Sequence, residues 1–484
     1  MASLTSKLHV SICLFSCIVA MALAGDYETA FLICASPLSS QQFPISEAIV
    51  GPKSPSFSNV LSFYVRNKRF ALPSTPKPQL IVTVKHESHA QAAVLCAKKL
   101  GLQIRMRSGG HDYEGLSYVS SVPFIIVDMF NLRSIDINLK DQTAWVQSGA
   151  LVGELYYKIA NKSNLYAFPA GVCPSLGVGG HFTNGGYGVM MRKYGLAVDN
   201  VIDARIVDAK GRILDRKAMG EDLFWALRGG EGSSFGIILS WQIKLVSVPE
   251  KVTVFNVDRT VEKGATDLVW KWQTIAHKLD ENLFLRLQLV TVNGTKPGTK
   301  TVQVSFIGMF LGEKPGLINL MDSAFPELGL ESKDCISMRW IESTLFFYGM
   351  PNGTPLEFLL QRNPGPSFYL KHKSDYVKKP ISKASLTYIF NVFTRVGELM
   401  MQWNPYGGKM AEIPETATAF PHRGSNIFKI QYLADWTKDG AAAESYYVNM
   451  IGKFFRAMTP FVSSNPREAF LNYRDIDVGS IGAS

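Results

Sequence analysis

Two glycine-dense segments, each carrying one nucleophilic side chain, constrain this chain more than any other feature of its sequence. Residues 107–118 read RSGGHDYEGLSY and contain His111, and residues 171–181 read GVCPSLGVGGH and contain Cys173. Glycine allows a backbone to approach a ligand closely and to adopt conformations that other residues avoid. Loops of this composition around a reactive side chain predict contact with a planar or phosphorylated ligand.

Other ligand-binding motifs do not account for these loops. A G-x-G-x-x-G fingerprint starting at Gly177 needs glycine where Phe182 stands, and no G-x-x-x-x-G-K-[ST] loop occurs. Two histidines and a thiolate can hold zinc, so His111, Cys173 and His181 form a conceivable alternative. These three lack the closely spaced ligand pairs of most zinc sites that a sequence reveals, and no metal is expected.

Length and composition indicate a globular protein with more than one domain. The 484 residues exceed one ordinary core, and 46% hydrophobic with 19% charged residues is typical of folded proteins. The formal net charge of +10 becomes +9 without residues 1–24, because Lys7 is the only charged residue among them. A basic balance suits acidic cell-wall polysaccharide as a partner, although plain solvated surface charge is the better explanation. No basic run is interleaved with aromatic residues, so no nucleic-acid partner is expected.

The N-terminus has the pattern of a secretory signal over residues 1–24. Lys7 precedes an apolar run at residues 10–23, and residues 22–24 form an A-x-A cleavage pattern. The run is too short for a membrane span, so we expect a secreted, extracellular protein without one. Secretion makes the three N-x-[ST] sequons candidate glycosylation sites, at Asn161, Asn293 and Asn352.

Hydrophobic periodicity divides the chain near Pro249. Before it, a strand at 80–84, a helix at 89–100 and a strand at 103–107 predict a βαβ unit. Further strands are expected at 124–127, 143–146, 201–207 and 237–245, and helices at 152–161 and 221–227. Beyond it, strands at 252–257, 283–292 and 302–311 alternate with helices at 266–277, 316–324 and 382–401. This pattern predicts a second α+β domain with an antiparallel sheet.

The two glycine-dense segments, with seven further ordered segments, resemble the plant berberine bridge enzyme-like family. The further segments are residues 31–34, 221–236, 340–343, 374–377, 404–408, 420–423 and 471–475. The resemblance implies an α+β, two-domain PCMH-type FAD-binding fold of the vanillyl-alcohol-oxidase kind. It places the FAD domain at 25–74 and 75–250, a substrate domain with its sheet over the flavin at 251–435, and a return to the FAD domain at 436–484.

In that family a histidine bonds the flavin 8α carbon and a cysteine thiolate bonds C6. The resemblance therefore implies bicovalent FAD on His111 and Cys173. Backbone N–H groups of the glycine loops suit the diphosphate. The other expected cofactor contacts are Arg107, Ser108, Gly109, Gly110, Leu176, Gly177, Gly179 and Gly180.

The resemblance also implies a pairing for the cysteines that remain after the signal is removed. Cys34 and Cys96 match the positions that form the family disulfide, and secretion permits disulfides. Cys173 is then taken by the flavin, and Cys335 is left as a free, buried thiol. A Cys173–Cys335 pair is the alternative.

Four residues match the family's catalytic site: Tyr473 as the base, Lys429 as its cation, and Tyr194 and Gln431 as hydrogen-bonding partners. The base takes the proton of the substrate hydroxyl while hydride passes to flavin N5. Because a free tyrosine has a pKa near 10, a neighbouring cation must stabilise the phenolate. The alternative makes Tyr473 and Tyr194 ordinary packed aromatics.

The resemblance implies oxidation of an alcohol, either of monolignol type or a sugar hemiacetal, with oxygen or a quinone-like acceptor. Leucine at position 176, near the oxygen-reactive edge of the flavin, favours a dehydrogenase over an oxidase. Asn184 and Glu231 stand where the family usually has glycine, and each either narrows the flavin pocket or faces solvent. The chain also stops at Ser484, where family members continue. The alternative reading is therefore a truncated, catalytically impaired, cell-wall-associated relative.

Overall fold

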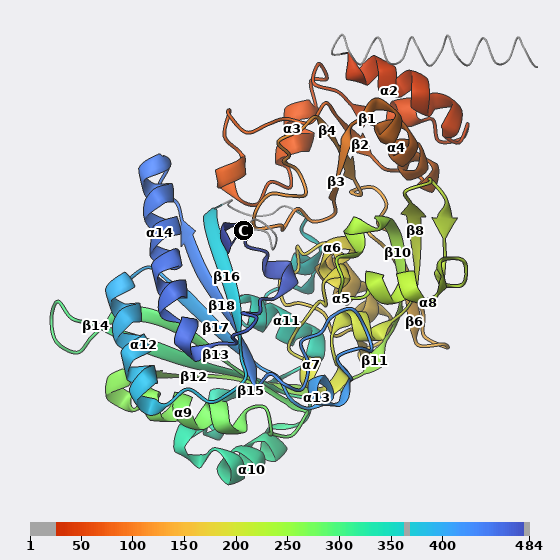
Figure 1. Cartoon of the computed structure of the whole chain (residues 1–484). Coiled ribbons are helices and arrows are strands. Elements are labelled where there is room, and N and C mark those ends of the chain that lie inside the picture. The colour runs from red at the N-terminus through yellow and green to blue at the C-terminus, as the bar shows by residue number, and fades with distance from the viewer. Residues whose placement is uncertain (1–25, 363–367, 479–484) are drawn as a thin grey trace, which may run out of the picture.

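The computed structural model describes residues 26–362 and 368–478 (Figure 1). The expected signal at 1–24 lies outside the described residues. Among the residues described, no helix is both long and apolar enough to cross a bilayer. Within the same ranges, the strands form sheets of four, five, two and seven strands.

The four-stranded sheet lies near the N-terminus and contains the predicted βαβ unit. Its order is β1 (Ile49–Val50), β2 (Leu80–Thr83), β4 (Phe124–Asp128) and β3 (Gln103–Arg107). Both β2 and β3 pair with β4 in parallel, so β4 inserts between the two strands that helix α4 (Glu87–Leu100) connects. Left-handed Gly101 ends α4 at its C-terminus.

A disulfide joins α4 to helix α2 (Tyr27–Ala35). Cys34 and Cys96 are bonded with their Cα atoms 5.9 Å apart, as expected. Cys173 and Cys335 are both free thiols, so the alternative pairing of these two does not occur, and Cys335 is buried.

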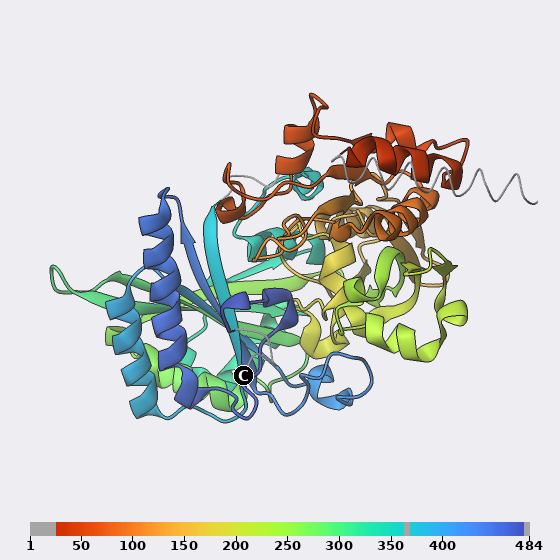
Figure 2. The same ribbon diagram turned by 45° about the horizontal axis from the view of Figure 1, so that its top comes forward.

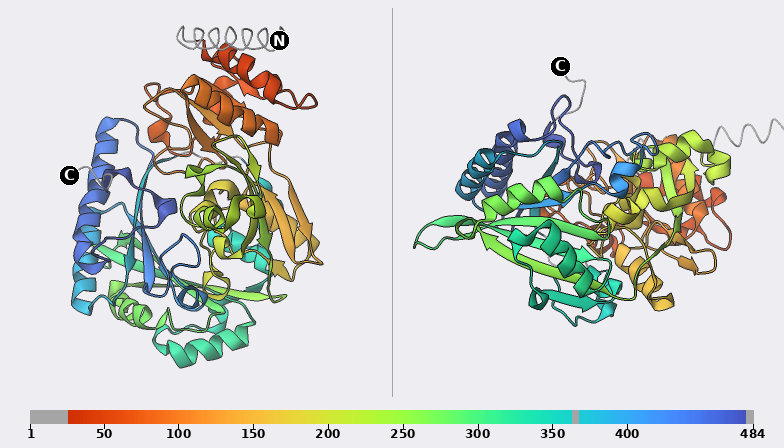
Figure 3. Two further views of the ribbon diagram at one scale, coloured as in Figure 1. Left: turned by 45° about the vertical axis from the view of Figure 1, so that its right-hand side comes forward. Right: turned by 90° about the horizontal axis from the view of Figure 1, so that it is seen from below.

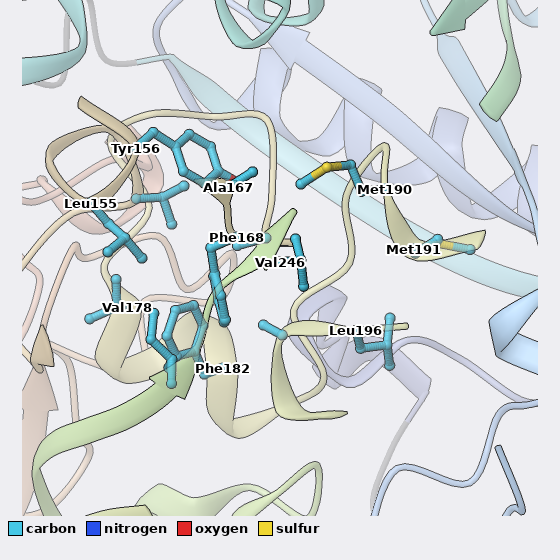
Figure 4. Packing of buried hydrophobic residues seen from close by; sticks show 14 of the residues in the cluster. Leu155, Tyr156, Ala167, Phe168, Val178, Phe182, Met190, Met191, Leu196 and Val246 are labelled. Atoms are coloured by element: carbon cyan, nitrogen blue, oxygen red, sulfur yellow. The ribbon is translucent and has the colours of Figure 1, made fainter. Parts of the chain in front are cut away.

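The five-stranded sheet is antiparallel and supports the second glycine-dense segment. Its order is β5 (Ile135–Asn138), β6 (Thr143–Gln147), β10 (Gly236–Lys244), β8 (Val201–Asp208) and β9 (Ile213–Leu214). The connection from β6 to β8 contains α5 (Val152–Lys162), β7 (Tyr166–Ala167), α6 (Val178–Thr183) and α7 (Met191–Tyr194). Helix α8 (Arg216–Leu227) precedes β10, and strand β11 (Val246–Ser247) follows β10. Leu155, Phe168 and Phe182 pack beneath this segment in one apolar cluster, which Figure 4 shows.

The seven-stranded antiparallel sheet takes all its strands from residues 252–436. Its order is β15 (Cys335–Met338), β12 (Val252–Thr260), β14 (Lys300–Phe310), β13 (Leu283–Asn293), β17 (Met400–Pro405), β18 (Phe428–Trp436) and β16 (Tyr369–Val377). Helices α9 (Ala265–Ile275), α10 (Lys314–Ala324), α12 (Lys383–Val396) and α14 (Ala441–Ala457) pack on one face, as Figures 1 and 3 show. Short helices α3 (Phe57–Ser62), α11 (Trp340–Tyr348) and α13 (Lys409–Glu412) lie in the connections.

One predicted helix is too long. The pattern over 382–401 favoured a single helix, whereas α12 ends at Val396 and β17 begins at Met400. Gly397 follows α12 with a φ of 96°, a conformation that glycine adopts without strain. The chain then turns back into the middle of the sheet.

The chain after α14 returns toward the N-terminal half. Figure 2 shows this final segment, in dark blue, between the seven-stranded sheet and the elements of the five-stranded sheet. Its described part contains three short 3₁₀ turns, Thr459–Phe461, Leu471–Tyr473 and Ile476–Val478. The segment brings Tyr473 to the face of the sheet opposite the helices, where the candidate site lies.

Candidate functional site

A cavity of about 700 Å³ lies between the glycine-dense segments and the seven-stranded sheet. Strands β13, β16, β17 and β18 contribute side chains to one wall, and the C-terminal segment contributes Tyr473. Most of the residues selected from the sequence line it: Ser108, Gly109, Gly110, His111, Cys173, Leu176, Gly177, Gly179, Gly180, Gln431 and Tyr473.

The two glycine-dense segments meet backbone to backbone. A Cβ atom on Gly109 would lie 2.4 Å from the amide nitrogen of Gly177, and one on Gly177 would lie 2.2 Å from that of Gly109. A side chain at either position would force the segments apart. Gly180, by contrast, lines the cavity with nothing within 4 Å of its Cβ position. The glycines thus bring two loops together and leave room beside them for a flat ligand.

His111 and Cys173 share one hydroxyl partner. The Ser175 Oγ atom lies 3.0 Å from His111 Nε2 and 3.4 Å from Cys173 Sγ. Burial, reinforced by the charge of Arg66, holds the pKa of His111 well below its usual value, so the imidazole is neutral. A neutral imidazole and a thiol at one end of a cavity are the nucleophiles that covalent attachment requires.

Arg66 supplies a buried positive charge to the same end. Its Nε donates to the carbonyl of Gly109 at 3.3 Å. Both terminal nitrogens are buried and have no hydrogen-bond partner among the described residues. Unsatisfied buried donors are costly, so a guanidinium in this state beside a cavity fits a ligand with acceptor oxygens or nitrogens. The donor set is suited to FAD.

Tyr473 and Tyr187 form the polar centre of the opposite end. Their hydroxyl oxygens are 2.6 Å apart. Lys429 Nζ lies 3.1 Å from the centre of the Tyr187 ring and 4.7 Å from that of Tyr473, and it lies behind the cavity wall. Burial raises the pKa of Tyr473 well above 10, and burial lowers the pKa of Lys429. Lys429 has no hydrogen-bond partner among the described residues, so the aromatic faces are its main contacts.

Arg286 is a residue of this site that the sequence analysis missed. It is fully buried on β13, lines the cavity and lowers the pKa of Tyr473 by its charge, against the larger effect of burial. Its Nε has no hydrogen-bond partner among the described residues. The available signal was a lone arginine in the otherwise largely apolar, alternating run LFLRLQL at residues 283–289.

Gln431 and Tyr113 complete the wall above Tyr473. Gln431 Nε2 donates to the Tyr113 hydroxyl at 3.0 Å. The Tyr113 and Tyr473 rings stack with their centres 5.5 Å apart. Gln431 therefore reaches the site, as expected, and its bonded partner is Tyr113.

Two expected site residues lie elsewhere. Arg107 does not line the cavity: its guanidinium is fully buried against Asp128 on the neighbouring strand and donates to the carbonyls of Val60 and Leu61. Tyr194 is also outside, because it stands at the end of α7 and donates its hydroxyl to Ser247. Both positional expectations are therefore wrong, and Tyr187 holds the place given to Tyr194.

Asn184 and Glu231, which stand where the family usually has glycine, both line the cavity. Glu231 has a φ of +61°, the left-handed region, and forms an ion pair with Arg474, the residue after Tyr473. Asn184 also faces the cavity, and its Oδ1 has no partner among the described residues.

Comparisons with known proteins agree with this arrangement. Residues 78–216 match the family model of an FAD binding domain. The chain is 53% identical to berberine bridge enzyme-like 9 of Arabidopsis thaliana, over 99% of this chain and 91% of that protein. The structure of BBE-like 28 from the same plant matches with a TM-score of 0.86 at 44% identity, over 90% of this chain and 89% of the other.

A further solved structure is Phl p 4, a grass pollen allergen with glucose dehydrogenase activity. Its TM-score is 0.87 at 42% identity, over 93% of this chain and 89% of the other. A variant of Phl p 4 with one isoleucine replaced by valine is described as a glucose oxidase.

An FAD-binding domain and a cavity lined by tyrosines beneath a second sheet define an FAD-dependent oxidoreductase. The chain belongs to the berberine bridge enzyme-like family. The expected PCMH-type fold, with an antiparallel sheet beside the flavin domain, is confirmed.

Proposed function

We propose that this protein oxidises a small alcohol with FAD attached through both His111 and Cys173. The observation that carries the proposal is the Tyr187–Tyr473 hydroxyl pair, 2.6 Å apart, in the cavity that His111 and Cys173 line. When bound, the flavin accepts the hydride that leaves the alcohol carbon. The protein's own side chains handle the proton.

Tyr473 is the proposed base. Its phenolic oxygen accepts the substrate hydroxyl proton, and the Tyr187 hydroxyl donates a hydrogen bond to that oxygen while it is ionised. A buried phenolate is costly, and burial raises the pKa of Tyr473 accordingly. The positive charge that offsets this cost is proposed to come from Lys429, against both rings, and from Arg286 on β13, whose charge lowers the pKa of Tyr473.

The proposed attachment uses the arrangement around Ser175. Its hydroxyl holds His111 Nε2 and Cys173 Sγ within hydrogen-bonding reach at one end of the cavity. Ser108, Gly109, Gly110, Gly177, Gly179 and Gly180 then offer backbone to the cofactor. Arg66 offers the two unpaired terminal nitrogens of its guanidinium.

The proposed substrate is a monolignol-type alcohol or a sugar hemiacetal. Tyr113, Tyr348 and Phe368 give the cavity aromatic walls, whereas Gln402, Asn404, His372 and Asp435 give it a polar floor. Activity of Phl p 4 on glucose supports the sugar. The proposed electron acceptor is oxygen or a quinone-like molecule, and Leu176 at the cavity wall, where the family resemblance associates leucine with dehydrogenases, supports the quinone-like one.

We also propose secretion to the plant cell wall. The disulfide supports an oxidising compartment, and all three sequon asparagines, Asn161, Asn293 and Asn352, are exposed. The formal net charge, +10 for the full sequence and +9 without residues 1–24, supports acidic polysaccharide as a neighbour.

Anaerobic mixing with monolignol-type alcohols and reducing sugars tests the function. A substrate bleaches the visible absorbance of the oxidised flavin within seconds to minutes. Dithionite serves as the control that the flavin is reducible. Bleaching by dithionite and by none of the alcohols or sugars would contradict the proposal.

A further inference from the structure

A buried ion cluster lies beside the cavity, outside the catalytic residues described above. Lys371 and Lys373, on strand β16, are 1% and 3% exposed. They face three carboxylates: Glu114 from the first glycine-dense segment, and Asp475 and Asp477 from the C-terminal segment. The cluster therefore joins three parts of the chain that are far apart in sequence.

Lys371 contacts all three carboxylates. Its Nζ bonds Glu114 Oε1, lies 2.8 Å from Asp475 Oδ1 and 3.0 Å from Asp477 Oδ1. Lys373 bonds the second oxygen of Asp475 and lies 3.3 Å from that of Asp477. Lys371 thus spans Glu114 and the C-terminal segment, whereas Lys373 reaches that segment alone.

The same carboxylates lie close enough together to bind a metal ion. The lysine ammonium groups already occupy the centre of the cluster, and Arg69 lies 3.9 Å from the other oxygen of Glu114. Arg69 also pairs with Glu444, 2.8 Å away, so three cationic side chains accompany four carboxylates, and the ammonium groups fill the place that a metal ion would take. We interpret the cluster as a structural ion network.

The cluster lies close in sequence to both His111, the proposed flavin attachment residue, and Tyr473, the proposed base. Glu114 is three residues from His111, and a turn in which Asp112 accepts from the amides of Glu114 and Leu116 fixes this stretch. Asp475 is two residues from Tyr473. Asn67 adds a second link, donating to the carbonyls of Tyr113 and Leu370.

We propose that Lys371 is a positioning residue that holds Tyr473 in register with the His111 segment. Without the ammonium of Lys371, Glu114 would keep only the more distant Arg69, and Lys373 alone would face both Asp475 and Asp477, so repulsion between the buried carboxylates would drive the two segments apart. A shift of the base by about 1 Å can cost on the order of 10²-fold in rate. The inference rests on the proposed role of Tyr473 as the base.

A double-mutant cycle on the rate of flavin reduction tests it. Lys371→Met should slow anaerobic reduction by about 10²-fold, while flavin stays bound to the acid-precipitated protein. In a Tyr473→Phe background the same change should cost almost nothing, because the group that it positions is gone. Lys378→Met, which removes an exposed partner of Glu468, is the matched control and should leave both rates unchanged.

The outcomes separate the two claims. An equal loss from Lys371→Met in both backgrounds, or an unchanged rate in the parent background, overturns the positioning role. A Tyr473→Phe variant as fast as the parent overturns the proposed base and this inference with it. If Lys371→Met fails to fold, Glu114→Gln cuts only the link to the His111 segment. Glu114→Gln should also slow flavin reduction in the parent background and cost almost nothing in the Tyr473→Phe background. An equal loss in both backgrounds also overturns the inference.

Discussion

The hydroxyl oxygens of Tyr187 and Tyr473 lie 2.6 Å apart over a buried lysine. Tyr187 comes from the loop after α6, and Tyr473 comes from the C-terminal segment 286 residues later. Each hydroxyl is the hydrogen-bonding partner of the other, and Lys429 and Arg286 are the cations that face the pair. The negative charge left when Tyr473 loses its proton is therefore compensated by groups from three other segments of the chain.

The first prediction concerns the base. Tyr473→Phe keeps the ring and removes the ionisable oxygen, so flavin reduction by substrate should slow by roughly 10²–10⁴-fold. Tyr187→Phe should slow it less, because it removes only the hydrogen bond to the phenolate. Stopped-flow absorbance measures both, and the visible spectrum should match the parent. Tyr194→Phe is the control, since Tyr194 bonds Ser247 outside the cavity, and its rate should equal the parent's.

The second prediction concerns pH. Only the ionised form of Tyr473 accepts a proton, so the rate of flavin reduction rises as pH passes the pKa of this group. Lys429→Met removes a cation that favours the phenolate, which raises that pKa further and shifts the profile to higher pH. Arg286→Met should shift it in the same direction, because its charge lowers the pKa of Tyr473. A downward shift, or none, in both variants would refute the electrostatic role.

The sequence predicted long, strongly patterned elements well. Strands β13 and β14 are alternating runs whose pairing buries a continuous apolar face, so local pattern and tertiary packing agree. The residues after α12 have no such agreement. Their local composition extends the helical pattern, and β17 exists because β13 and β18 pair with it on either side. Neighbours distant in sequence decide such a strand.

The site shows the same division. His111, Cys173, Gln431 and Tyr473 reach the cavity where the family resemblance placed them. Tyr187 and Tyr194 are seven residues apart, both near glycines, and sequence alone did not indicate which ring turns inward. The path of the chain through Gly185 and Gly186, with φ of 111° and 72°, decides that. Arg107 was expected to contact the ligand because it begins the first glycine-dense segment. Its actual partner, Asp128, lies on a separate strand, and the sequence alone does not reveal this pairing.

The third prediction tests attachment. If His111 and Cys173 both bind FAD, the yellow colour should remain with acid-precipitated protein. His111→Ala and Cys173→Ala should each retain flavin through the other link, and the double variant should release it. Cys335→Ala removes a free thiol that lies outside the cavity, and it is the matched control that should keep the flavin. Release of flavin from the parent protein would rule out covalent attachment.

The fourth prediction concerns Glu231, a non-glycine residue with a φ of +61°. Glu231→Gly removes backbone strain and also removes the ion pair with Arg474, whose side chains are 27% and 29% exposed. Such a partly exposed pair contributes about 0–1 kcal/mol. Glu231→Ala loses the same pair and keeps the strain, so it should be less stable than Glu231→Gly by about 1 kcal/mol. Thermal unfolding of both variants measures this, and the reverse order would show that the left-handed backbone is not strained.

The last prediction concerns oxygen. Leu176 lines the cavity, and its Cδ1 would lie 2.8 Å from a Cβ on Gly171, so the wall is tightly packed around this side chain. We expect Leu176 to restrict the approach of dioxygen while leaving the Tyr187–Tyr473 end untouched. Reduction by substrate and reoxidation by oxygen are then separable, and the parent should reoxidise slowly in air but turn over readily with a quinone-like acceptor.

Leu176→Val removes one methylene and opens space on that wall without adding a polar group. Reoxidation by oxygen should accelerate by about 10-fold or more, since 1.4 kcal/mol of relieved crowding corresponds to that factor, and the rate of substrate reduction should barely change. Leu176→Ile, which keeps the side-chain volume, is the matched control. Stopped-flow reoxidation of the reduced proteins in aerated buffer gives the comparison. Equal oxygen rates in the three proteins, or a parent that reoxidises as fast as the valine variant, would show that another residue controls access.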